Sequence, residues 1–173
     1  EDPDQYPVIG FCPDWRLQSD YGGKKERGYI PFIYSQFLNL MKKAKFRLYI
    51  MKFEDKIEGL GTVLARLILP GGRDLDPELY GEKNTHSKFD KVDAKLRWDF
   101  CADKIENAPK KLPILGICYG YEFLHCYFGG KMVQHLSNAD EHYQPRTFDV
   151  VEGTHLAKAI APKIEMTGPC YHH

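Results

Sequence analysis

The sequence lacks an excess of charge of either sign and lacks long apolar runs. Its 24 lysines and arginines equal its 24 aspartates and glutamates, so the formal net charge is zero. This balance gives no electrostatic reason to expect nucleic acid or an anionic membrane as a partner. The apolar runs are also far shorter than the roughly 20 residues that cross a bilayer as a helix. We therefore expect neither a nucleic-acid-binding nor a membrane-spanning protein.

Metal-binding patterns are also missing. The five cysteines, at positions 12, 101, 118, 126 and 170, have no CxxC or Cys/His spacing suited to zinc. The acidic residues Asp74, Asp76 and Glu78 have no histidine cluster beside them, so we expect no metal and no organic cofactor. The odd number of cysteines favours free thiols and a reducing compartment such as the cytoplasm. The alternative is a lysosomal or secreted protein, if a signal peptide preceded Glu1.

The remaining pattern alternates between strands and helices. Apolar runs typical of buried strands occur at residues 7–11, 46–51, 66–69 and 113–117. Helical spacing of apolar residues occurs at residues 29–44, 56–64, 93–107 and after 118. This alternation predicts an α/β fold with a mainly parallel sheet and helices on both faces. Because no repeat or linker interrupts the 173 residues, we expect a single domain over 1–173.

Details of these elements are predicted from single residues. Pro31 suits the first turn of the helix at 29–44, and residues 20–28 are typical of a polar loop. The stretches 131–135 and 147–151 predict short antiparallel strands. The helix at 93–107 is expected to bury one face, formed by Ala94, Trp98, Cys101, Ala102 and Ile105.

The most informative stretch of the chain is residues 113–130. Its apolar run leads into Gly116-Ile117-Cys118-Tyr119-Gly120, and an amphipathic segment follows. This pattern is typical of a nucleophile elbow with cysteine in the place of serine. The flanking glycines allow strand, turn and helix to approach without Cβ clashes. At a helix N-terminus Cys118 is favoured as a thiolate, and the Tyr119 amide could hold an oxyanion. The alternative, an inert buried cysteine, is disfavoured by the glycines.

A second glycine-rich turn, Pro70-Gly71-Gly72, follows the apolar run at 65–69, and the acidic segment 74–82 comes next. In an open parallel sheet, turns of this kind lie at the carboxyl edge, where sites form. The other interpretation of the glycine pair is a plain tight turn.

Together these segments resemble class I glutamine amidotransferase-like proteins, in particular the γ-glutamyl hydrolase-like branch called peptidase family C26. Residues 67–82 match its LLLPGGxDxxPxxYGE pattern, and residues 113–134 match PxLGICxGxQxLNxxxGGxLxQ. Residues 7–11 match its opening strand, and residues 153–160 and 170–173 match its late segments weakly. The matches follow the family order over nearly the whole chain. The resemblance implies a flavodoxin-like sheet.

The resemblance also implies roles for residues around Cys118, which would be the nucleophile. The backbone amides of Gly72 and Tyr119 would form an oxyanion hole, although Tyr119 replaces an arginine frequent in the family. Glu122, where the family commonly has glutamine, would contact the α-amino end of a γ-glutamyl group. The alternative for Glu122 is a solvated helix carboxylate.

Two further residues, Asp74 and Tyr80, would shape the rim of the pocket or only stabilise their own loop. The family completes its triad with a histidine and an acid well downstream, but no His-x-Glu follows Cys118 before the last residue, His173. We expect that this downstream segment is missing from the 173 residues. The alternatives are a base from another chain and an inactive protein.

Three functions stay open at this stage. The first is a cysteine hydrolase that cleaves γ-glutamyl amide or isopeptide bonds of a small substrate through a γ-glutamyl thioester. The acidic segment 74–82 favours it. The second is a glutaminase domain that passes ammonia to a synthetase partner. The third is a catalytically inactive structural or binding member within a larger assembly.

Overall fold

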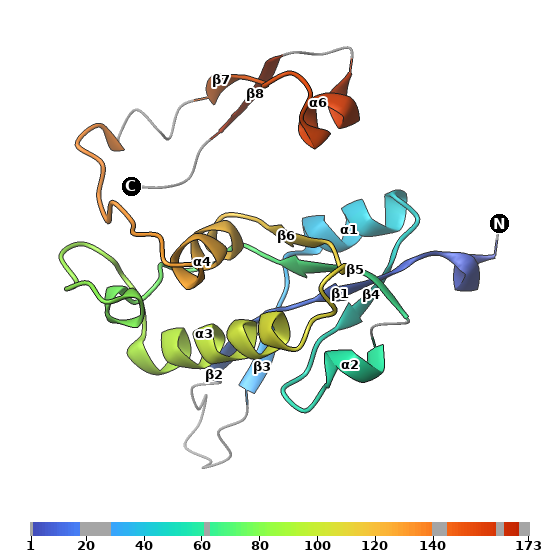
Figure 1. Ribbon diagram of the computed structural model, residues 1–173, viewed down its shortest axis with the longest axis horizontal. Helices are drawn as coiled ribbons and strands as arrows, with labels where there is room; N and C mark the ends of the chain where they lie inside the picture. The colour runs from blue at the N-terminus through green and yellow to red at the C-terminus, as the bar shows by residue number, and fades with distance from the viewer. Residues whose placement is uncertain (1, 18–28, 61–62, 140–144, 162–164, 170–173) are drawn as a thin grey trace. The chain divides into compact units, whose positions relative to one another are not determined.

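The structure is a computed structural model that describes residues 2–17, 29–60, 63–139, 145–161 and 165–169. The chain divides into two compact units, Glu1–Met132 and Val133–His173, which are described separately (Figure 1). The expected single domain over 1–173 stays a prediction. The polar loop predicted at 20–28 lies outside the described residues.

The first unit contains a four-stranded, all-parallel sheet with the strand order β4-β1-β5-β6. Its strands are β1 (Val8–Phe11), β4 (Arg47–Ile50), β5 (Leu64–Leu69) and β6 (Ile114–Gly116). The helices around it are α1 (Ser35–Lys43), α2 (Ile57–Leu60), α3 (Lys91–Glu106) and α4 (Tyr119–Tyr127). Short 3-10 turns add η1 (Pro3–Gln5) and η2 (Pro77–Tyr80).

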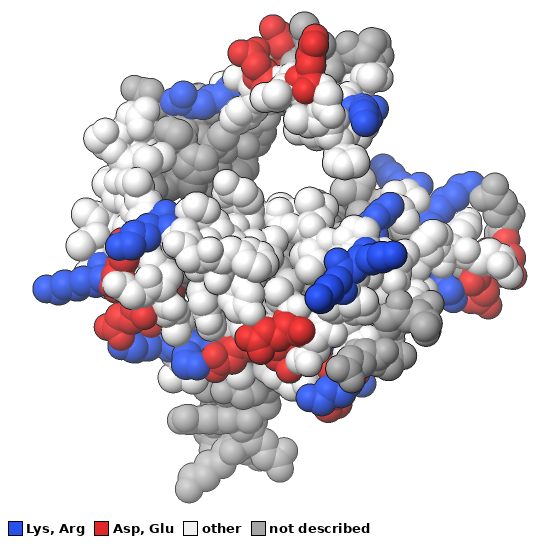
Figure 2. All heavy atoms as spheres, in the orientation of Figure 1, with Lys and Arg blue, Asp and Glu red and all other residues white. Residues whose placement is uncertain are grey.

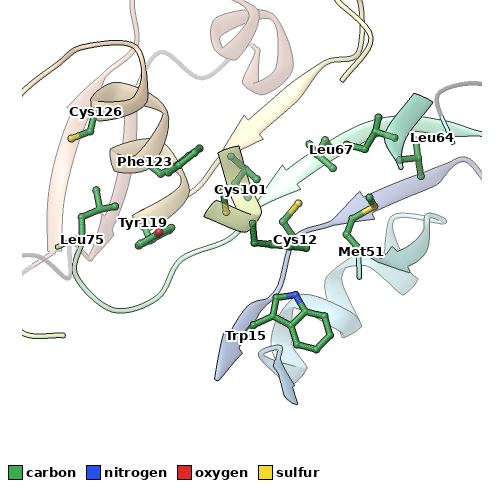
Figure 3. Close-up of a cluster of buried hydrophobic side chains, with 13 residues drawn as sticks. Cys12, Trp15, Met51, Leu64, Leu67, Leu75, Cys101, Tyr119, Phe123 and Cys126 are labelled. Atoms are coloured by element: carbon green, nitrogen blue, oxygen red, sulfur yellow. The ribbon is translucent and has the colours of Figure 1, made fainter. Parts of the chain in front are cut away.

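Helices cover both faces of the sheet, as side-chain alternation along β5 shows. Leu67 and Leu69 join a core with residues of α3 and α4, such as Phe100 and Phe123. Ile68, between them, joins a second cluster against α1. Figure 3 shows part of the larger core. The predicted α/β fold with a parallel sheet flanked by helices is therefore confirmed.

The helix predicted at 29–44 is wrong over its first part. Residues 29–32 form strand β3 (Tyr29–Phe32), which pairs antiparallel with β2 (Asp14–Leu17), and α1 begins only at Ser35. Pro31 lies in this ladder, opposite Trp15. A proline is tolerated there because both strands of a two-stranded ribbon are edges. Local apolar spacing could not reveal a pairing with a distant segment.

The strand predicted at 131–135 is also wrong, because these residues form neither strand nor helix. The Lys131 carbonyl lies 3.0 Å from Nε2 of His125 at the end of α4, and the Gly130 amide donates to the His125 carbonyl at 2.8 Å. These contacts fold the segment back onto α4 and take up a carbonyl that a ladder would need.

The second unit contains an antiparallel pair, β7 (Pro145–Asp149) and β8 (Glu165–Pro169), so the strand expected near 147–151 is present. Helix α6 (His155–Ile160) starts after Thr154, whose hydroxyl accepts from the Ala157 amide at 3.1 Å.

In the part of the chain that the structure describes, no helix is long and apolar enough to cross a membrane. Acidic and basic side chains lie side by side on the face in Figure 2.

Candidate active site around Cys118

Cys118 lies at a sharp turn between β6 and α4. Its backbone has φ 52° and ψ −113°, a conformation that residues other than glycine rarely adopt. Its side chain is exposed, and α4 begins directly after it, with the Glu122 amide donating to the Cys118 carbonyl at 3.0 Å. The strand, the cysteine turn and the helix predicted from the sequence are therefore present, and the exposed thiol lies at the sheet edge.

The glycines on either side of Cys118 are required by backbone packing. A Cβ on Gly116 would lie 2.6 Å from the Gly120 carbonyl group. A Cβ on Gly120 would lie 2.0 Å from the carbonyl oxygen of Leu69 at the end of β5. That same oxygen accepts from the Ile117 amide at 2.9 Å. Strand, turn and helix thus approach as closely as the sequence predicts.

The Pro-Gly-Gly loop after β5 lies directly against Cys118. A Cβ on Gly71 would lie 3.3 Å from Cβ and 3.7 Å from Sγ of Cys118. A Cβ on Gly72 would lie 1.9 Å from Nη1 of Arg97 in α3. The two glycine-rich turns therefore meet at the carboxyl edge of the sheet. The convergence of the Gly72 and Tyr119 amides on one oxyanion stays a prediction.

Arg97 links the two turns. Its side chain is 3% exposed, and its Nη2 donates to the carbonyls of Pro70 at 2.8 Å and Gly71 at 3.0 Å. Its guanidinium lies 3.5 Å over the ring of Tyr119, the residue after the cysteine. Its Nη1 lies 3.7 Å from Oδ1 of Asp14. One buried cation therefore touches the loop and the start of α4 together.

Sequence reasoning missed this arginine because a charged residue was not expected on the buried face of α3. The structure buries Arg97, Phe100 and Lys104, whereas Trp98 and Ile105, expected on that face, are only partly buried. A signal was present, because Arg97 lies three residues after Ala94 and four before Cys101, on their side of the helix.

Tyr80 and Glu122, two predicted substrate contacts, lie within electrostatic reach of each other. Burial raises the pKa of Tyr80 to about 12, and the charges of Cys126, Glu82 and Glu122 add to this rise. Glu122 also helps burial to raise the pKa of Cys126 to about 11. The charges of Glu122 and Glu82 therefore act on the phenol of Tyr80, and Glu122 lies on α4 one helical turn from Cys118.

The acidic segment 74–82 builds its own loop. Oδ2 of Asp74 accepts from the Lys88 amide at 2.6 Å, and Oδ1 of the buried Asp76 accepts from the Glu78 amide at 3.0 Å. Gly81 ends η2 with φ 81°, which only glycine adopts freely. These contacts give Asp74 a structural task, and its role at the pocket rim stays a prediction.

The other described cysteines are buried, whereas His125 on α4 is exposed. Cys12, Cys101 and Cys126 are buried free thiols, whereas Cys118 is exposed. Burial raises the pKa of Cys12 and raises that of Cys101 to about 12. The His125 ring packs on Gly130, where a Cβ would lie 2.4 Å from it. Cys170, His142, His172 and His173 lie outside the described residues.

An apolar cavity of about 200 Å³ lies beside the loop, and Gly71 and Ile117 form part of its wall. The remaining wall is aromatic and aliphatic and comes from Phe11, Phe32, Ile33, Tyr34, Phe37 and Pro70. Among the described residues, no group of three or more His, Cys, Asp or Glu side chains could hold a metal ion.

The parallel sheet, the strained cysteine between strand and helix, and the glycine loop beside it define an α/β protein of the class I glutamine amidotransferase-like type. The family model described as Peptidase C26 matches residues 7–173, and the chain belongs to this family. The predicted family is therefore confirmed.

Curated relatives support the same assignment. A protein of Mycobacterium tuberculosis, provisionally named a glutamine amidotransferase, is 32% identical over 129 residues, covering 67% of this chain and 41% of that protein. A glutamine amidotransferase-like protein of Lactococcus lactis is 32% identical over 107 residues, covering 60% and 44%. A Schizosaccharomyces pombe protein, provisionally named a glutamine amidotransferase, is 36% identical over 75 residues, covering 42% and 28%. The matched part of the chain spans less than half the length of each of these relatives.

Proposed function

We propose that the complete protein is a cysteine hydrolase that cleaves γ-glutamyl amide or isopeptide bonds of small substrates. The observation that carries this proposal is the exposed Cys118 with φ 52° between β6 and α4, with Gly71 packed against its sulfur. A strained, exposed thiol at a helix N-terminus is suited to attack a carbonyl group.

In the proposed reaction, Sγ of Cys118 bonds to the γ-carbonyl carbon and the carbonyl electron pair moves to oxygen. The amides of Gly72 and Tyr119 donate to this oxyanion. The C–N bond then breaks, the amine leaves with a proton, and a γ-glutamyl thioester remains. Water adds to the thioester, which releases glutamate and restores the thiol. The family resemblance implies that a histidine moves these protons.

Substrate recognition follows from the two sides of Cys118. On the α4 side, Glu122 would bind the α-amino group of the γ-glutamyl part, with Tyr80 nearby. On the other side, the cavity beside Gly71 and Ile117 has no charged side chain in its wall. Burying a charged glutamyl end there would be costly, so we assign the cavity to the amine part.

A second candidate is a glutaminase that delivers ammonia to a synthetase partner, and the names of the relatives favour it. The two differ in their substrates. The hydrolase would cleave γ-glutamyl amides of larger amines, whereas the glutaminase would cleave only glutamine.

The test uses the full-length protein with a γ-glutamyl dipeptide, a γ-glutamyl anilide and glutamine. Release of amine and ammonia is measured, and acid-quenched protein is examined by mass spectrometry for a γ-glutamyl group on Cys118. Cleavage of the larger amides with this adduct supports the hydrolase. Cleavage of glutamine alone supports the second candidate, and the absence of both product and adduct supports an inactive family member. Cys118→Ala is the negative control.

A further inference from the structure

We propose that Arg97 is a positioning residue that orients both amides of the oxyanion hole. This inference rests on the proposed function, since it concerns the same site. Arg97 would touch no substrate atom. It would act through the peptide of Gly71 and Gly72 on one side and through Tyr119 on the other.

Arg97 holds the peptide between Gly71 and Gly72 in one orientation. In a trans peptide the carbonyl and the following N–H point in opposite directions. Because Nη2 of Arg97 holds the Gly71 carbonyl at 3.0 Å, the Gly72 N–H faces away from the guanidinium. Two adjacent glycines rotate easily, and the second bond from Arg97, to Pro70 at 2.8 Å, opposes that rotation.

Arg97 also packs against Tyr119, the residue that carries the other amide donor. The guanidinium packs 3.5 Å over the ring of Tyr119, which is 2% exposed. Fixing this ring fixes the first residue of α4, whose amide is the second donor. Arginine suits the task because its planar group donates at its edge while its face stacks on a ring. A single side chain therefore couples the two halves of the oxyanion hole.

Stability alone does not explain an arginine at position 97. Nε and Nη1 of Arg97 are buried and have no hydrogen-bond partner within the described residues, although Nη1 faces Asp14 at 3.7 Å. Buried donors without acceptors destabilise a fold, and well-packed apolar residues in place of both members of a buried ion pair are often no less stable. The group instead holds one geometry of the loop.

Lys104 supplies a matched control on the same helix. It is fully buried, and its Nζ donates to the carbonyls of Phe53 at 3.2 Å and Asp55 at 2.7 Å. It also lies 5.1 Å from the Phe100 ring. Lys104 thus holds a loop as Arg97 does, but the loop follows β4 and carries no predicted catalytic group.

The experiment compares two reactions of Cys118 in the full-length protein. Acylation by p-nitrophenyl acetate passes through a tetrahedral oxyanion, whereas alkylation by iodoacetamide does not. We expect Arg97→Lys and Arg97→Met to slow acylation about tenfold or more, with alkylation changed less than about twofold. The kcat for a γ-glutamyl amide should fall with KM nearly unchanged, and Arg97→Lys should retain more activity than Arg97→Met. Lys104→Met should leave the ratio of the two rates unchanged.

Equal slowing of both reactions by Arg97→Lys, or an equal change of the ratio by Lys104→Met, would overturn the inference. Urea unfolding and near-ultraviolet circular dichroism confirm that each variant is folded, and Arg97→Lys serves as the decisive variant if Arg97→Met does not fold. If the wild type cleaves no γ-glutamyl compound but the ratio responds to Arg97, the proposed function fails and the positioning role stands.

Discussion

The two glycine-rich turns beside Cys118 keep their shapes in different ways. In the turn after β6, Gly116 and Gly120 allow backbone to pack on backbone. A Cβ on Gly116 would meet the Gly120 carbonyl group, and a Cβ on Gly120 would meet the Leu69 carbonyl. In the turn after β5, Gly72 leaves room for the side chain of Arg97, which comes from a separate helix. Glycine therefore permits close contact between backbone segments in one turn, and in the other it makes room for a side chain from a separate helix.

This difference has a consequence for function. The elbow is held by backbone groups, those of its own residues and the Leu69 carbonyl at the end of β5. The Pro-Gly-Gly loop depends on a residue more than 20 positions further along the chain. Arg97 donates to two carbonyls of the loop and also packs over the ring of Tyr119 at the start of α4. We therefore expect changes at Arg97 to act on both turns, and most directly on the loop.

The largest expected effect is on the elbow itself. Cys118→Ser should lower γ-glutamyl hydrolysis about a thousandfold or more, because a serine hydroxyl is a far weaker nucleophile without its own base. Release of amine by the full-length protein measures this, and Cys126→Ser, a change at a buried cysteine on the same helix, is the control. Unchanged hydrolysis in Cys118→Ser would remove this residue from the mechanism.

The next effect compares the two turns directly. Gly120→Ala should destabilise the fold by about 3–5 kcal/mol, because its Cβ would lie 2.0 Å from a backbone oxygen that cannot move. Gly72→Ala should cost about 1–3 kcal/mol, since the atom at 1.9 Å belongs to a side chain that can shift. Gly168→Ala, where nothing lies within 4 Å of the added Cβ, is the control. Urea unfolding measures the free energy of unfolding of each variant. An equal loss in Gly120→Ala and Gly72→Ala would contradict the comparison.

A smaller effect concerns the thiols. Burial raises the pKa of Cys101 to about 12 and that of Cys126 to about 11. Both thiols are therefore protonated near pH 8. A glutamine-like electrophile should therefore modify Cys118 ahead of both by about tenfold or more. Mass spectrometry of the labelled peptides measures the order. Label spread evenly over the cysteines would favour the inactive family member.

Because the Cys101 thiol is buried in the folded protein, the free energy of unfolding depends on pH in the alkaline range. Cys101 has a folded pKa of about 12 against 9.0 for an ordinary thiol. The folded protein therefore holds a proton that the unfolded chain loses, and its contribution is complete below pH 9 and is lost as pH rises toward 12. Urea unfolding at pH 8 and pH 10 should show a loss that Cys101→Ala makes smaller. No difference between the two proteins would contradict this.

The smallest effect is expected in the loop that follows Gly72. Asp76→Ala removes the acceptor of the Glu78 amide at the start of η2 and should cost about 1 kcal/mol. Asp76→Asn keeps an acceptor and should cost less. Chemical unfolding measures both. A larger loss in hydrolysis than in stability for Asp76→Ala would show that this loop also shapes the site.

Much of the first unit could be predicted from the sequence because its signals are local. Local sequence is enough to recognise the two glycine turns and the apolar runs of the parallel sheet, which are β1, β4, β5 and β6. No information about residues in contact with them is needed. The failures have a common cause. Strand β3 depends on pairing with β2, and the stretch 131–135 is turned back by contacts with His125. Periodicity contains no information on such partners.

The sequence by itself determined the parallel α/β fold, the family, and the cysteine between glycines at the end of a strand, because apolar runs and glycine spacing are visible within short segments of the chain. Only the tertiary structure decided which charged residues lie inside. Arg97 and Lys104 occupy the buried face of α3 because carbonyls of distant loops lie within reach of their side chains. A buried cation is stable only where acceptors meet it, and their positions exist only once the chain has folded.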